Sequence, residues 1–270
     1  MPANPNYPEL AAAQGHWRYQ PAANCLQGKN ILVTGAGSGI GAAAAKTYAC
    51  YGANVLLLGR TRSHLESVFD WIEANTDTQA VIIPCDLRAL DDDSAQALVA
   101  AVVEGYGQLD GLLHCASTLG PKVPVAHYPP EQWAEVMHVN ATAPFVLTHA
   151  LLPLMLDHPR RASIVFVSST VGRQGRAYWG AYAVSKHALE GLMEVLADEH
   201  ETAGNLRVNS VNPGATRTAM RALAYPGENP ADVPTAETKM DVFVYLMDDT
   251  SENLTGAALD ARDWAGPNGE

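Results

Sequence analysis

The chain has 270 residues, 47% of them hydrophobic, and a formal net charge of −12 at pH 7. This length and apolar content suffice for one domain with a large buried core. The acidic balance argues against a surface that binds nucleic acid or an anionic membrane.

The N-terminal segment and the cysteines indicate a cytoplasmic protein. No apolar run approaches the roughly 18 residues of a membrane span, and residues 1–20 lack the basic and apolar regions of a secretory signal. The four cysteines are widely spaced and form neither a C-x-x-C pair nor a zinc pattern: Cys25, Cys50, Cys85 and Cys115. We expect them to be reduced thiols.

Apolar runs and helical spacings alternate along the chain. Residues 1–27 predict a loosely held arm, because they contain Pro2, Pro5, Pro8 and Pro21. Short apolar runs predict strands at 30–34, 53–58, 80–83, 110–115, 164–167, 206–211 and 255–260. Helical periodicity predicts helices after the glycine turn that follows residue 34 and at 62–75, 91–106, 131–156 and 182–203, with one or two more in 215–247. Pro144 is expected to bend the helix at 131–156.

This alternation predicts one architecture. Strands that alternate with helices form right-handed βαβ units and a parallel sheet that is covered on both faces. The expected fold is a single doubly wound α/β domain of the Rossmann type over residues 28–262, with a mostly parallel seven-stranded sheet flanked by helices. Residues 263–270 are expected to form a polar tail.

A glycine-rich turn, TGAGSGIG, directly follows the first strand and opens the first helix. Gly35, Gly39 and Gly41 permit a tight turn, close approach of a pyrophosphate and close helix packing, and the helix N-terminus attracts phosphate. The spacing G-x-x-x-G-x-G differs from the ordinary dinucleotide fingerprint, but its place between a strand and a helix is the one that a dinucleotide site requires.

The end of the second strand distinguishes NADP from NAD. An NAD site presents an acid to the ribose 2′-hydroxyl about 20 residues after the turn, and residues 55–65 contain none. Arg60 and Arg62 stand there instead, and a guanidinium can pair with a 2′-phosphate, so NADP is predicted over NAD. The alternative is a solvated loop charge. Asp86, after the third strand, could accept from the adenine amino group or cap its own loop.

Tyr182 and Lys186 are four residues apart in a predicted helix, so both project from one face. An ammonium about 4–5 Å from a phenol favours the phenolate by about 3–4 kcal/mol at an effective dielectric near 20. We therefore expect the pKa of Tyr182 to be lowered towards neutrality. Ser168 and Ser169, at the end of the preceding strand, could hold a substrate oxygen beside that phenol. A core tyrosine and a solvated lysine would give the same spacing.

The motifs TGxxxGxG, S-x12-Y-x3-K, HVNATAPF and NPGATRT together resemble the short-chain dehydrogenases/reductases of the classical type, over roughly residues 28–262. Ser169 lies 13 residues before Tyr182, which selects it over Ser168, and Asn140 lies 29 residues before Ser169. More narrowly, the segments SSTVGRQGRAYWGAYAVSK and NPGATRTAMRA look like the YciK-type reductases.

The resemblance implies an NADP(H)-dependent oxidoreductase that transfers hydride reversibly between nicotinamide and a carbonyl or alcohol substrate. Tyr182 would act as the general acid or base, and Ser169 would orient and polarise the substrate oxygen. Lys186 would bind the nicotinamide ribose and lower the pKa of Tyr182, and Asn140 would complete a proton relay through a water. The implied cofactor contacts are Gly35, Ser38, Gly39, Ile40, Gly41, Arg60, Arg62, Asp86, Leu87, Ala116, Tyr182, Lys186, Pro213, Gly214, Thr216 and Thr218.

One departure from the family pattern lies after the fourth strand, where Asn-Ala-Gly is replaced by Cys115-Ala116-Ser117. Cysteine makes weaker hydrogen bonds, and Ser117 adds a side chain beside the cofactor. We expect some loss of stability or cofactor affinity, and the mechanism to remain. The change also leaves an alternative open, a catalytically silent NADP-binding regulatory or scaffold protein of the same fold.

Substrate contacts in the family come from loops that correspond to 117–128, 170–181 and 214–235. They contain four arginines, Arg173, Arg176, Arg217 and Arg221. Our hypothesis is that some of them face the pocket and favour an anionic or acyl-carrier-type substrate; alternatively, they tie loops to acidic helices or to another subunit. Tyr178 and Trp179 could be pocket walls, and 222–234 could be a lid.

Partners other than the small-molecule substrate follow from the same resemblance. Residues 131–156 and 182–203 correspond to the family's subunit-packing helices, so a homodimer or homotetramer is expected. The histidines are scattered and predict no metal site: His127, His138, His149, His158 and His187.

Overall fold

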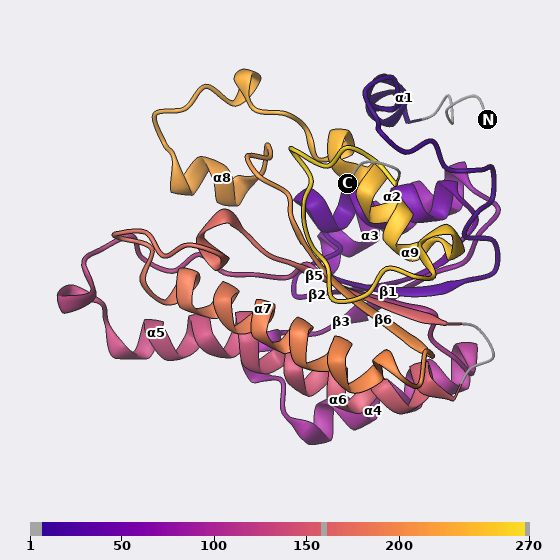
Figure 1. Cartoon of the computed structure of the whole chain (residues 1–270), viewed down its shortest axis with the longest axis horizontal. Helices are drawn as coiled ribbons and strands as arrows, with labels where there is room; N and C mark the ends of the chain where they lie inside the picture. The colour runs from indigo at the N-terminus through magenta and orange to yellow at the C-terminus, as the bar shows by residue number, and fades with distance from the viewer. Residues whose placement is uncertain (1–6, 158–160, 268–270) are drawn as a thin grey trace.

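The computed structural model describes residues 7–157 and 161–267. In these residues seven parallel strands form one sheet in the order β3-β2-β1-β4-β5-β6-β7 (Figure 1). The strands are β1 (Asn30–Thr34), β2 (Asn54–Gly59), β3 (Ala80–Pro84), β4 (Gly111–His114), β5 (Ala162–Val167), β6 (Leu206–Asn212) and β7 (Ala258–Asp260). The predicted doubly wound α/β fold is confirmed.

Helices cover both faces of the sheet, and Figure 1 shows α1, α2, α3 and α9 on one side and α4 to α7 on the other. Their bounds are α1 (Pro8–Gln14), α2 (Gly39–Cys50), α3 (Arg62–Asn75), α4 (Asp92–Tyr106), α5 (Pro130–Met137), α6 (Ala143–Leu156), α7 (Gly180–Glu201), α8 (Ala219–Ala224) and α9 (Met240–Met247). Alternate residues of β1 enter the two cores: Ile31 and Val33 face the α2 side, and Leu32 faces the α4 side. Every residue of β1 is buried, as in a central parallel strand.

The strand order reverses beside β1, whose neighbours are β2 and β4. The chain therefore leaves the carboxyl ends of β1 and β4 in opposite directions, and a crevice opens between them. In open α/β sheets ligands bind in such a crevice.

The loosely held arm that the sequence predicts is not found in residues 7–27. Tyr7 and Trp17 are 4% and 6% exposed, and both donate hydrogen bonds of 2.9 Å to Glu237, Tyr7 to a carboxylate oxygen and Trp17 to the main-chain carbonyl. The arm is held because its apolar residues are buried against the domain, and Pro8 is compatible with a helix because it begins α1, where no N–H is needed. The predicted polar tail is also partly packed: Trp264 is half-buried, with its ring centre 5.4 Å from that of Tyr245, and Gly266 is buried. Residues 1–6 and 268–270 lie outside the described part of both segments.

The predicted helix at 131–156 is divided between α5 and α6 by a π-helical segment, His138–Thr142. Pro144 is in the first turn of α6, where its missing N–H leaves the carbonyl of Asn140 without the usual partner four residues on, and a wider turn accommodates this. The run Pro130–Leu156 is also long and apolar enough to cross a membrane by length and composition, which the sequence analysis missed. Half of its most apolar window is buried, and Leu147 and Leu151 belong to the core under the sheet, so it packs as a core helix.

Candidate active site

Two adjoining cavities open at the carboxyl ends of the strands. The first, of about 260 Å³, is lined by the ends of β5 and β6, by α7 and by α8, and the second, of about 330 Å³, is lined by the ends of β2 and β3. Four residues line both: Gly35, Ser38, Ala116 and Ser117. The cavities therefore meet at the glycine turn and form one cleft.

The glycine turn is packed so closely that it leaves no room for a side chain at Gly35 or Gly41. Gly35 has a φ of +69°, and a Cβ there would lie 2.9 Å from the Cα of Ala116. A Cβ on Gly41 would lie 2.3 Å from the carbonyl oxygen of Gly35. Ser38 is the N-cap of α2 and makes no side-chain capping bond, so the first amides of the helix and the Ser38 hydroxyl are available to an anion. This cradle fits a phosphate group.

Thr34, a residue that the sequence analysis did not single out, holds the two loops of the cleft together. Its hydroxyl accepts hydrogen bonds from the amides of Cys115, at 2.9 Å, and Ala116, at 3.0 Å, and donates to the carbonyl of Leu113 at 3.3 Å. A strand-end threonine beside the glycine turn could have indicated this role. In the family pattern an asparagine side chain holds this backbone, whereas here Thr34 holds it without the Cys115 side chain. Burial raises the pKa of the Cys115 thiol to about 12.

Three of the predicted catalytic residues meet in the first cavity. Ser169 lies two residues beyond the end of β5 and caps the short turn that follows, while Tyr182 and Lys186 face the cavity from α7. Lys186 is 2% exposed; its Nζ donates to the carbonyl of Val167 at 2.8 Å and lies 5.7 Å from the ring centre of Tyr182.

The predicted lowering of the tyrosine pKa is not found. Burial raises the pKa of Tyr182 to about 12, although hydrogen bonding to Ser169 opposes that rise. Burial also lowers the pKa of Lys186 to about 8. The prediction was wrong because it counted the attraction between the two groups and neglected the cost of removing both from water. At neutral pH Tyr182 is therefore a phenol that carries its proton.

Asn140 lies behind the cavity, in the π-helical segment, and is fully buried. Its side chain accepts from the amide of Thr118 and donates to the carbonyl of the same residue, both at 2.8 Å, and it also donates to the hydroxyl of Ser185 at 3.1 Å. It thus joins the loop after β4 to the helix that carries Tyr182. The structure places Asn140 next to α7, outside the lining of the cavity.

At the other end of the cleft, Arg60 lines the second cavity, but Arg62 does not. Arg62 begins α3 and pairs with Glu66 at 2.8 Å, one helical turn on. Asp86 also lines the cavity, and its carboxylate accepts from the amide of Arg88 and pairs with that guanidinium at 2.6 Å. Asp86 therefore caps its own loop, one of its two predicted roles, and it also lines the cavity, so the contact with an adenine stays a prediction. Arg88 adds a guanidinium that the sequence did not point to.

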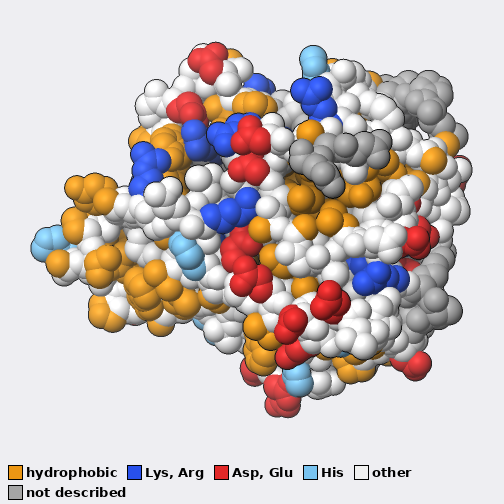
Figure 2. Space-filling model, in the orientation of Figure 1, with side chains coloured by type: hydrophobic (Ala, Val, Ile, Leu, Met, Phe, Trp, Pro, Cys, Tyr) orange, Lys and Arg blue, Asp and Glu red, His pale blue; other side chains and the backbone are white. Residues whose placement is uncertain are grey.

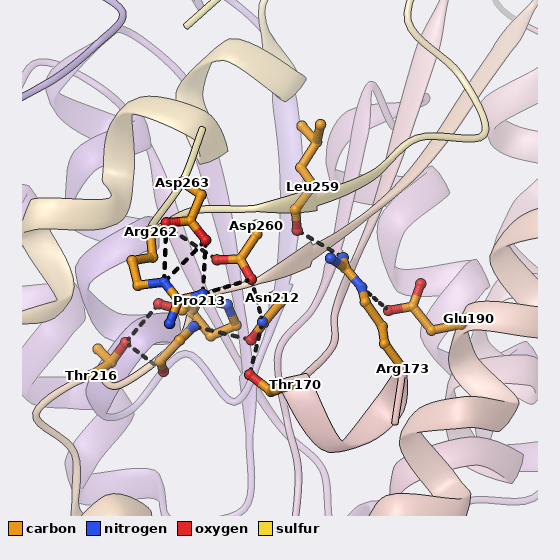
Figure 3. A network of polar contacts seen from close by, with 11 residues as sticks. Thr170, Arg173, Glu190, Asn212, Pro213, Thr216, Leu259, Asp260, Arg262 and Asp263 are labelled. Carbon is orange, nitrogen blue, oxygen red and sulfur yellow. Dashed lines mark hydrogen bonds and ion pairs between the residues drawn. The ribbon is translucent and has the colours of Figure 1, made fainter. Parts of the chain in front are cut away.

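The turn after β6 is held in place by the side chain of Asn212 (Figure 3). Its amide donates to Thr170 at 3.0 Å and to Asp260 at 2.8 Å, and its oxygen accepts from the amide of Gly214 at 3.1 Å. Four predicted residues of this segment line the first cavity: Pro213, Gly214, Thr216 and Thr218. The network fixes them relative to the turn that begins at Ser169.

The four loop arginines have different partners. Arg173 pairs with Glu190 at 3.3 Å and donates to the carbonyl of Leu259, and Arg217 donates to the carbonyls of Ala231 and Val233. Neither lines the first cavity, so for these two the alternative holds: they tie loops together. Of the four, only Arg221 lines this cavity.

Of the two residues predicted to be pocket walls, one lines the cleft and the other does not. Trp179 is 9% exposed and lines the first cavity, whereas Tyr178 is 58% exposed and lines neither cavity of the cleft. Within residues 7–157 and 161–267 no group of three or more His, Cys, Asp or Glu side chains is arranged to hold a metal. His158 lies outside the described residues.

Comparisons with known proteins agree on one family. A family model described as short chain dehydrogenase matches residues 29–229. The chain is 48% identical over 244 residues to the oxidoreductase YciK of Escherichia coli (strain K12), which covers 90% of this chain and 96% of that protein. A solved short chain dehydrogenase from Shigella flexneri 2a, complexed with NADP, is 47% identical with a TM-score of 0.86 and covers 89% of this chain and all of the other. One from Escherichia coli CFT073, complexed with NADPH, is 48% identical with a TM-score of 0.85 and covers 90% and 100%.

Proposed function

The chain belongs to the short chain dehydrogenase family, oxidoreductases that act on CH–OH or C=O groups, and on this premise we propose that it uses NADP(H) to interconvert a carbonyl and an alcohol. The observation that carries the proposal is the meeting of Ser169, Tyr182 and Lys186 in a cavity that adjoins the glycine turn. The relatives are named as oxidoreductases and dehydrogenases, which favours an enzyme over a silent scaffold.

The residues of the cleft fit a dinucleotide. The glycine cradle and the N-terminus of α2 would hold the pyrophosphate, and the turn after β6 would meet the nicotinamide carboxamide. Lys186, beside the same cavity, would bind the nicotinamide ribose. When bound, the cofactor supplies or accepts the hydride.

The second cavity would take the adenosine end of the cofactor. Arg60 would pair with the 2′-phosphate, and Arg88, held by Asp86, adds a second guanidinium to that cavity. Two arginines favour NADP over NAD. The relatives solved with NADP and NADPH support the same choice.

The proton transfer rests on Tyr182. Because its pKa is raised to about 12, the phenol holds a proton at neutral pH and can donate it to a carbonyl oxygen. Ser169, which lines the same cavity, would donate a hydrogen bond to that oxygen and hold it in place. In the oxidative direction Tyr182 must first lose this proton, and the nearby ammonium of Lys186 favours that loss. Asn140 would act as a positioning residue, through its bonds to Thr118 and Ser185.

We further propose a homodimer or homotetramer in the cytoplasm, formed through α6 and α7. Large apolar side chains on these helices support this, since Phe145, Val184 and Val195 are 54%, 45% and 54% exposed. Light scattering on the purified protein measures the number of subunits. A monomer at micromolar concentration would contradict this part of the proposal.

The function is tested by following NADPH consumption with a panel of aldehydes and ketones. Tyr182→Phe should reduce turnover by about 100-fold or more, because the phenylalanine has no proton to donate. Its affinity for NADPH, measured by nicotinamide fluorescence, should be nearly unchanged. If neither NADPH nor NADH binds the wild-type protein, the proposal is wrong.

A further inference from the structure

Tyr225, which follows α8 and lines the first cavity, is surrounded by three cationic side chains. The guanidinium carbon of Arg221 lies 3.7 Å from its ring centre, and the ammonium of Lys122 lies 4.7 Å from it. Arg176 donates to its hydroxyl at 3.3 Å. Figure 2 shows Lys and Arg side chains gathered over α8 and the loops beside it, next to apolar side chains. We call Lys122, Arg176 and Arg221 the cationic rim.

An aromatic wall leads from this rim to the reacting phenol. The ring centre of Trp179 lies 5.9 Å from that of Tyr225 and 5.8 Å from that of Tyr182, and the ammonium of Lys122 lies 4.6 Å from it. The three aromatic residues line the same cavity. A flat or apolar substrate can therefore lie along the wall with its carbonyl at Tyr182 and its far end at the rim.

The rim carries more positive than negative charge. Glu228 pairs with Arg221 through two hydrogen bonds of 2.6 Å, which neutralises one cation. Lys122 is oriented by a bond of 2.7 Å to the carbonyl of Ala224, and neither it nor Arg176 has an ion pair with a described residue. Like charges gathered around one ring repel one another, so an anion bound beside them would relieve the repulsion. This local excess of positive charge contrasts with the net charge of −12 on the whole chain.

We propose that the cationic rim selects substrates that carry a carboxylate at the end distant from the reacting carbonyl, with a flat or apolar body between the two groups. Lys122 and Arg176 supply the selectivity, because Glu228 already neutralises Arg221. Trp179 and Tyr225 hold the body of the substrate. This inference rests on the proposed function and names its substrate class.

The test compares 4-formylbenzoate with its methyl ester, two aldehydes of the same shape that differ in one charge. Isothermal titration calorimetry on the complex of the protein with NADP⁺ measures the affinity for each without turnover. We expect the carboxylate to bind about tenfold more tightly, and Lys122→Met and Arg176→Gln each to reduce this ratio about three- to fivefold. Arg173→Gln is the matched control, because Arg173 lies in the same loop as Arg176 but pairs with Glu190; it should leave the ratio unchanged.

Equal affinity for acid and ester in the wild-type protein would overturn the inference, and so would failure of the acid to bind. A ratio that survives both substitutions would also overturn it. Turnover is scored separately with NADPH. Selective binding of the acid without NADPH consumption by any carbonyl would contradict the proposed function and leave the rim as an anion site. Reduction of acid and ester with equal efficiency would support the proposed function and contradict the selectivity of the rim.

Discussion

The ammonium of Lys186 donates a hydrogen bond of 2.8 Å to the main-chain carbonyl of Val167. This bond joins α7, which carries Tyr182, to the end of β5, which leads into Ser169. The lysine therefore holds the helix that carries Tyr182 against the strand end that precedes Ser169. The ammonium is buried, and removing a charge from water costs free energy of folding.

The cost should appear in the pH dependence of stability. Burial lowers the pKa of Lys186 from 10.5 to about 8, so between these values the unfolded chain binds a proton that the folded protein does not. The free energy of unfolding must then rise with pH. We expect the wild-type protein to gain about 2 kcal/mol over Lys186→Met between roughly pH 7 and 9.5, measured by urea unfolding. If the difference in the free energy of unfolding between the wild-type protein and Lys186→Met did not change with pH, the lysine would keep its ordinary pKa.

Arg60→Ala should weaken NADPH binding about 10- to 100-fold, because a guanidinium–phosphate contact is lost. NADH, which lacks the 2′-phosphate, should bind as before. Arg62→Ala is the matched control: this arginine pairs with Glu66, does not line the cavity, and should leave both affinities unchanged. Titrations followed by nicotinamide fluorescence give all the affinities. Equal losses for NADPH and NADH after Arg60→Ala would refute a 2′-phosphate role.

Thr34→Val should reduce the free energy of unfolding by about 2–4 kcal/mol, since it leaves the buried amides of Cys115 and Ala116 without their shared acceptor. It should also weaken NADPH binding, because that backbone lines both cavities of the cleft. Thr47→Val makes the same chemical change at a fully buried hydroxyl that has no hydrogen-bond partner among the described residues. We expect that control to be neutral or stabilising in the same urea experiment.

Trp17→Ala tests whether the N-terminal segment is part of the fold. The side chain is 6% exposed and donates to the carbonyl of Glu237, so its loss should cost about 3–5 kcal/mol in the free energy of unfolding. Tyr178→Ala removes an aromatic side chain that is 58% exposed, and should change stability by less than about 0.5 kcal/mol. If Trp17→Ala were as mild as the control, residues 7–27 would be the loose arm that their prolines suggest.

The sequence by itself determined the features that depend on neighbours in the chain. β1 and α3 have the predicted bounds. β1 is a continuous buried run that a glycine follows, and α3 has apolar residues at helical spacing and ends before a threonine. The sequence also predicted the glycine turn and the common helical face of Tyr182 and Lys186, because both depend only on residues that are close together in the chain. The alternation of strands and helices predicted the parallel sheet covered on both faces, because consecutive parallel strands are joined by right-handed crossovers. The order of the strands came from the structure.

Only the tertiary structure decided what each polar side chain contacts. Asp86 pairs with Arg88, a partner that the sequence did not indicate, and Thr34 is a shared acceptor because β4 lies beside β1. The pKa of Tyr182 depended on how much water its packing excludes, which spacing along a helix cannot report. Burial and hydrogen-bond partners are set by residues far apart in the chain, and a local pattern carries no information about them.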